Sequence, residues 1–118
     1  MQDFPNDHEL MGFFEAEPTI LDPGVPWIYN VLDFSTRRNG IEVRARITPA
    51  SGALALSLLL AGHEFALFEL RDAESFRIVA DDQREALVMT FAAQRGLEDF
   101  VLQLRPRVWV SWGNQRFP

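Results

Sequence analysis

The pair Asn39–Gly40 constrains the fold more than any other feature of the sequence. A two-residue hairpin of type I′ needs positive φ at both central residues, which asparagine and glycine adopt most readily. Apolar and polar residues alternate on both sides of the pair, as in antiparallel strands with one buried face. The sequence therefore predicts a tight hairpin within residues 28–48.

The turn fixes which residues lie opposite each other. One face should carry the pairs Leu32–Ile47, Phe34–Ala45 and Thr36–Val43, and the other face Asp33–Arg46, Ser35–Arg44 and Arg37–Glu42. A register shift of one residue would scramble both faces. We expect Phe34 and Val43 to be buried, and Asp33 and Arg46 to point outward.

A basic stripe lies on the outer face of this predicted hairpin. It consists of Arg37, Arg38, Arg44 and Arg46. The acids Asp33 and Glu42 interleave with it, and such opposite-charge pairs stabilise a sheet surface by about 0.2–1 kcal/mol each. The stripe is more typical of a solvated, salt-bridged face than of a nucleic-acid groove.

Short strands separated by turns continue along the rest of the chain. The predicted strands are Ala53–Ala61, Glu64–Leu70, Phe76–Ala80, Ala86–Ala92, Phe100–Leu104 and Val108–Trp112. The turn after the first of these is Ala61–Gly62 or Gly62–His63. The segment Leu97–Leu104 also has helical spacing, but a strand is favoured.

The first two of these strands are apolar on both faces. They should be central in the sheet, with Leu56, Leu58, Leu67 and Phe68 nearly fully buried.

The connections are too short to hold a crossover helix, which excludes a parallel sheet. The predicted fold is all-β and mainly antiparallel, a meander of seven to eight short strands forming a sandwich or an open barrel. The 118 residues predict a single domain over 1–118, with an N-terminal arm at 1–26 and the β meander at 27–113.

The N-terminal arm is predicted to be helical or irregular. Asn6 and Glu9 have the spacing of a capping box, which favours a short helix over Asp7–Phe14 with Leu10, Phe13 and Phe14 facing inward. The strand Val108–Trp112 is apolar and ends the meander, so it should be an exposed edge. We expect the arm's aromatic residues to cover this edge. The alternative is a weak homodimer through the edge strand.

The amino-acid composition excludes most kinds of catalytic site. The chain has no cysteine, and its 11 basic residues are all arginine, so thiol nucleophiles, thiolate metal sites, disulfides and Schiff-base lysines are excluded. The two histidines, His8 and His63, are far apart in sequence, and no serine lies in a G-x-S-x-G motif. We predict no catalytic, cofactor or metal site. A non-enzymatic protein is favoured, although the sequence does not decide the question.

Two groups of residues are candidates for binding. The first group consists of the acidic residues Asp72, Glu74, Asp81 and Asp82, which lie at adjacent turns. Carboxylates in such positions can hold a divalent cation or face a basic partner. The alternative is that these residues are acidic only because the turns are exposed to solvent. The aromatic residues Trp27, Tyr29, Trp109 and Trp112 lie near the start and end of the strand series. If the first and last strands are close, these rings form a protein-binding hot spot or a ligand pocket, with core packing as the alternative.

Net charge and hydropathy limit the partners. A net charge of −6 repels phosphate backbones and favours a basic protein partner over nucleic acid. The N-terminus lacks the pattern of a secretion signal, and the longest apolar run, Ala53–Ala61, is too short to cross a bilayer. We therefore expect a cytoplasmic protein that does not bind membranes.

Four short motifs carry a resemblance to known proteins. They are Phe14–Pro18 (FEAEP), Pro26–Asn30 (PWIYN), Leu102–Pro106 (LQLRP) and Ser111–Gly113 (SWG). With these motifs the chain resembles a group of small uncharacterised bacterial all-β proteins over about residues 13 to 113. In size, acidity and fold class it is also similar to the immunity proteins that neutralise toxins in bacterial competition.

These observations predict a small bacterial, non-enzymatic protein-interaction or immunity-like module. The alternative is a small-ligand-binding barrel or sandwich that uses an aromatic pocket. We expect it to be a monomer or a weak homodimer.

Overall fold

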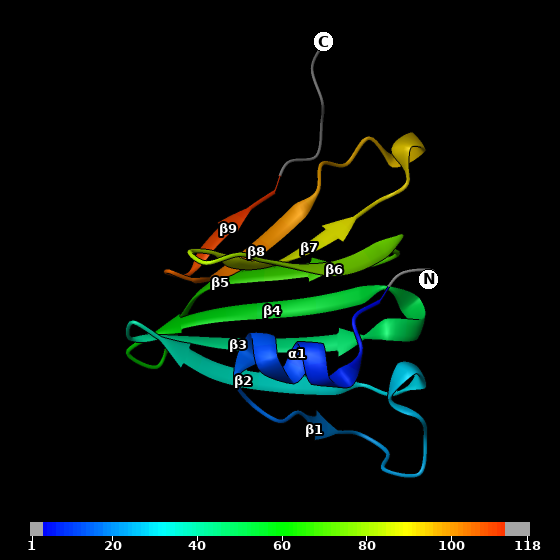
Figure 1. Ribbon diagram of the computed structural model, residues 1–118, viewed down its shortest axis with the longest axis horizontal. Coiled ribbons are helices and arrows are strands. Elements are labelled where there is room, and N and C mark those ends of the chain that lie inside the picture. The colour runs from blue at the N-terminus through cyan, green and yellow to red at the C-terminus, as the bar shows by residue number, and fades with distance from the viewer. Residues whose placement is uncertain (1–3, 113–118) are drawn as a thin grey trace.

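The strands form two antiparallel sheets, and each strand pairs only with its neighbours in sequence (Figure 1). The computed structural model describes residues 4–112. The first sheet contains β1 (Thr19–Ile20), β2 (Leu32–Arg38), β3 (Ile41–Thr48), β4 (Ala53–Leu60) and β5 (His63–Leu70). The second contains β6 (Ser75–Ala80), β7 (Glu85–Thr90), β8 (Phe100–Arg105) and β9 (Trp109–Ser111).

The predicted all-β antiparallel meander is confirmed, and the two sheets do not close into a barrel. The described chain has more strands than expected because the N-terminal segment contributes β1, which pairs with β2. Gly113, where the predicted meander ends, lies outside the described residues.

The β2–β3 hairpin has the predicted turn and register. Asn39 and Gly40 have φ values of 53° and 82°, and every predicted pair is present. Phe34 and Val43 are buried. On the opposite face, Arg46 donates to Asp33 through Nε at 2.8 Å and through Nη2 at 3.0 Å.

Two ambiguities in the sequence are resolved by the structure. The β4–β5 turn is Ala61–Gly62, with φ values of 52° and 81°. The segment that also fitted a helix is a strand from Phe100 onward. Pro106 follows the end of β8 and lies at the corner before β9.

Helix α1 (Asp7–Phe14) begins at the predicted capping box. The backbone N–H of Glu9 donates to Asn6 Oδ1 at 2.9 Å, and the backbone N–H of Asn6 donates to Glu9 Oε1 at 3.0 Å. The inward residues Leu10, Phe13 and Phe14 are buried, and Phe14 stacks on Phe34 with ring centroids 4.5 Å apart. The helix contacts both β2 and β7.

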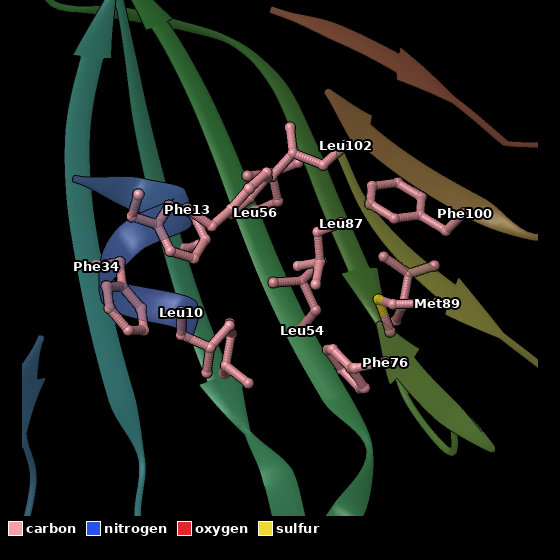
Figure 2. Packing of buried hydrophobic residues seen from close by; sticks show 14 of the residues in the cluster. Leu10, Phe13, Phe34, Leu54, Leu56, Phe76, Leu87, Met89, Phe100 and Leu102 are labelled. Atoms are coloured by element: carbon pink, nitrogen blue, oxygen red, sulfur yellow. The ribbon is translucent and has the colours of Figure 1, made fainter. Parts of the chain in front are cut away.

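The prediction that this arm covers the last strand is therefore wrong. Leu10 and Phe13 point into the space between the two sheets (Figure 2). A helix with three large buried side chains stabilises the fold more by filling the core than by shielding an edge.

The core lies between the inner faces of the sheets. It includes Leu54, Leu56, Leu87, Met89, Phe100 and Leu102, which meet in Figure 2. The predicted burial of Leu56 and Leu58 on β4 is confirmed. Burial of their neighbours on β5 is not: Leu67 is 53% exposed and Phe68 is half-buried.

The reason is that β5 is the last strand of its sheet. No second layer among the described elements covers the outer face of β5. Apolar residues on both faces of a strand therefore do not show that the strand is central.

Arg38 does not belong to the basic stripe that was predicted on the outer face. It lies on the inner side of β2, and its Nη2 reaches Phe14 O at 3.2 Å and Glu15 Oε1 at 2.9 Å at the end of α1. Arg37, Arg44 and Arg46 remain on the outer face. Each forms a salt bridge with an acidic residue. Arg37 and Arg44 pair with Glu42, and Arg46 pairs with Asp33.

Candidate protein-binding groove

The segment between α1 and β2 folds into a fixed loop because one buried amide organises it. Asn30 is almost fully buried, and its Oδ1 accepts from the backbone N–H groups of Asp22 and Val31, each at 3.0 Å. Its Nδ2 donates to Asp22 O at 2.6 Å and to Val25 O at 3.0 Å. Buried polar groups with all their partners in place hold one conformation.

This loop and α1 enclose a hollow of about 200 Å³, which we call the N-terminal groove. Met11 on α1, Pro18 just before β1 and Ile20 in β1 provide apolar surface. Trp27, in the short 3₁₀ helix η1 (Trp27–Tyr29), lines it together with the core residues Leu32 and Phe34. Two acidic residues, Asp7 and Glu17, complete the lining.

The Trp27 ring is held in place by its neighbours. Its centroid lies 5.4 Å from that of Phe4, which in turn packs 5.0 Å from Phe76 in the second sheet. Trp27 is half-buried, so part of the indole is accessible. Outside the groove lining, the same loop also exposes Leu21 and Tyr29.

The groove is acidic and lacks a cation of its own. Within residues 1–36 the chain has no arginine, lysine or histidine apart from His8. Among the residues that the structure describes, neither Asp7 nor Glu17 forms a salt bridge, and Asp7 Oδ1 accepts only a backbone N–H, from His8 at 3.0 Å. The nearest arginine in sequence that turns toward α1, Arg38, is paired with Glu15.

The structure separates the predicted aromatic group into two places. Trp27 and Tyr29 lie on η1, before β2, whereas Trp109 lies on β9 and Trp112 just after it, on the far side of the molecule (Figure 1). Trp112 packs edge-on against Phe100, with centroids 6.3 Å apart.

Trp109 lines a separate hollow of about 250 Å³ with Arg84, Gln103 and Arg107. The four rings therefore do not form one pocket. The hollows lined by Trp27 and by Trp109 are both smaller than about 300 Å³, the lower end of the range for small-molecule sites.

The acidic group is also divided. Asp72 and Glu74 lie between β5 and β6, whereas Asp81 and Asp82 lie in the β6–β7 turn. The six residues of β6 separate the two pairs by about 20 Å.

Asp81 has a local structural role. Its Oδ1 accepts the backbone N–H groups of Gln83 and Arg84, each at 2.8 Å, and these bonds lower the pKa of the Asp81 carboxyl. In the part of the chain at residues 4–112, no group of three or more potential ligand side chains is arranged to hold a metal ion.

Two larger hollows, of about 420 and 390 Å³, lie on the outer face of the first sheet. Arg46 and Ala55 line both. The Arg46 guanidinium is already engaged by Asp33, which raises the pKa of Arg46. Arg44 on this face is likewise paired with Glu42, whereas Glu69 and Arg71 in the larger hollow form no salt bridge among the described residues.

No helix in the described residues has the length and apolar character needed to cross a bilayer.

Sequence reasoning identified Trp27 but missed the rest of the groove. Met11, Pro18 and Ile20 belong to different elements, and their meeting depends on how α1 docks. The absence of any arginine or lysine before Arg37 was the one signal in the sequence that pointed to this region.

No protein-family model and no curated protein matches the sequence. Among solved structures, the chain is similar to one from the contact-dependent growth inhibition toxin–immunity protein complex of Klebsiella pneumoniae 342. The TM-score is 0.78 at 18% sequence identity, and the match covers 94% of this chain and 95% of that one. The two chains share one fold. The match spans both sheets and is not limited to a common hairpin.

Proposed function

We propose that this protein is an immunity protein that binds and neutralises a contact-dependent growth inhibition toxin in the cytoplasm of a bacterium. The observation that carries the proposal is the fold likeness over nearly the whole length of both chains to a member of such a toxin–immunity complex. The resemblance in size and acidity to immunity proteins, noted from the sequence, supports the same function.

The chemistry of the chain favours the immunity role over the toxin role. The sequence lacks cysteine and lysine, and its two histidines lie on different elements, His8 on α1 and His63 at the start of β5. An immunity protein needs only a surface that blocks its toxin. A net charge of −6 suits a toxin with a basic surface, because opposite charges speed association and select the partner.

Co-expression tests this function directly. A candidate toxin domain, chosen from the genes next to this chain's own gene, is induced in cells with and without this protein, and growth is measured together with the mass of the purified complex. We expect restored growth and a one-to-one complex. A toxin domain from an unrelated system is the control, and it should still arrest growth. Growth arrest caused by this chain alone, or no rescue and no complex, would contradict the proposal.

A further inference from the structure

We propose that the N-terminal groove binds a cationic side chain, arginine in preference to lysine, presented by a basic segment of the protein partner. The identity of that partner as a toxin rests on the proposed function. The binding chemistry rests on the groove itself. Three features carry it: apolar walls, an accessible indole ring and two carboxylates without a cation.

The apolar walls suit the stem of a long cationic side chain. Met11, Pro18 and Ile20 line the groove, and its volume of about 200 Å³ is suited to one side chain and is small for a drug-sized ligand. Arginine and lysine bury their methylene groups against apolar surface while the charged end stays near water or a counter-charge.

The indole of Trp27 adds selectivity for a cation. Packing against Phe4 holds the ring in the groove lining. A guanidinium or ammonium group near the face of a tryptophan is attracted by the ring, and arginine makes this contact more often than lysine because it is planar and less strongly hydrated.

The carboxylates complete the site. Asp7 in the first turn of α1 and Glu17 beside β1 both line the groove and form no salt bridge in the described chain. A guanidinium can donate to carboxylates with two parallel hydrogen bonds, which adds to the preference for arginine. A nucleic acid or a second copy of this acidic chain would bring negative charge toward these groups.

A pair of peptides tests the groove without the toxin. The probe is acetyl-Gly-Arg-Gly-Arg-Gly-amide, and its uncharged control carries citrulline in place of both arginines. The indole N–H signal of Trp27, assigned with Trp27→Phe, is followed by NMR. We expect a saturable shift with the arginine peptide and none with the citrulline peptide. Asp7→Asn combined with Glu17→Gln should weaken the affinity by about fivefold.

The matched control is Glu64→Gln combined with Asp99→Asn, which removes the same charge on β5 and just before β8, away from the groove. It should bind the peptide like the unmodified protein. Melting temperatures of both variants check that each is folded. Equal shifts with both peptides, or equal weakening by both variants, would overturn the proposal. A Trp27 signal that changes with protein concentration alone would also overturn it, because a second copy would then occupy the groove.

The toxin separates this inference from the proposed function. If the toxin binds, Asp7→Asn with Glu17→Gln should lower its affinity and flatten the salt dependence, while the control variant should not. A toxin that binds the groove variant with unchanged affinity would contradict the inference and leave the function intact. If the toxin fails to bind the unmodified protein, the function fails, and the peptide experiment still decides the chemistry of the groove.

Discussion

The burial of a leucine in this protein depends on the strand that carries it. Leu56 on β4 is fully buried between the sheets, whereas Leu67 on the neighbouring β5 is 53% exposed. We predict that Leu56→Ala lowers the free energy of unfolding by about 2–5 kcal/mol, because it leaves a cavity in a packed core. Leu67→Ala should change it by no more than about 0.5 kcal/mol. Urea denaturation measures both, and equal costs would contradict the core described here.

The same two residues show what the sequence can and cannot predict at this scale. Alternation of apolar and polar residues predicts which side chains share a face, and it predicted the pairing of Phe34 with Ala45 and of Asp33 with Arg46. It does not predict whether a second layer covers that face. Leu67 was therefore misplaced, and so was Arg38, whose side chain turns toward α1.

At the scale of elements, the tight turns set the register of the first sheet. The β4–β5 turn places Ala61 at a φ of 52°, in the left-handed region that glycine tolerates and alanine does not favour. We predict that Ala61→Gly raises the free energy of unfolding by roughly 0.5–1 kcal/mol, because the relief of strain exceeds the entropy that glycine loses on folding. The midpoint of urea denaturation measures this.

A second glycine substitution provides the matched control. Ala55 lies within β4, where no positive φ is present, so Ala55→Gly should lower the free energy of unfolding by about 0.5–1 kcal/mol. If Ala61→Gly is destabilising to the same degree, the strain at the turn is not what limits this hairpin.

For helix α1, the sequence predicted where the helix lies in the chain but not where it packs in the fold. Its bounds and its capping box are local features, and both were predicted correctly from Asn6 and Glu9. Its docking site depends on contacts between distant segments, such as the stacking of Phe14 on Phe34, which no local pattern encodes. The groove beside α1 was missed for the same reason.

At the scale of the whole molecule, α1 joins the two sheets into one packed unit. It carries three buried side chains and contacts both β2 and β7. We predict that a chain lacking residues 1–14 loses its cooperative thermal unfolding transition, because the core is opened to water. Calorimetry measures this. Phe14→Ala is the milder test and should cost about 3–5 kcal/mol.

Substitution of Trp109, which is exposed on β9, is the matched comparison. Trp109→Ala should leave the transition cooperative and shift it much less than Phe14→Ala. A truncated chain that melts cooperatively near the original temperature and differs only in oligomeric state would show that α1 is a cover for an edge strand and not part of the core.

The sequential pairing of the strands has a consequence for how the chain finds its fold. Every ladder in residues 4–112 joins strands that are adjacent in the chain, with β1 to β5 in one sheet and β6 to β9 in the other. Loop-closure costs are therefore small at each pairing step, and contact order is low for an all-β protein. A backbone cut between β5 and β6 would break no ladder. The two halves are thus natural fragments for reassembly, each carrying all of its own strand pairs.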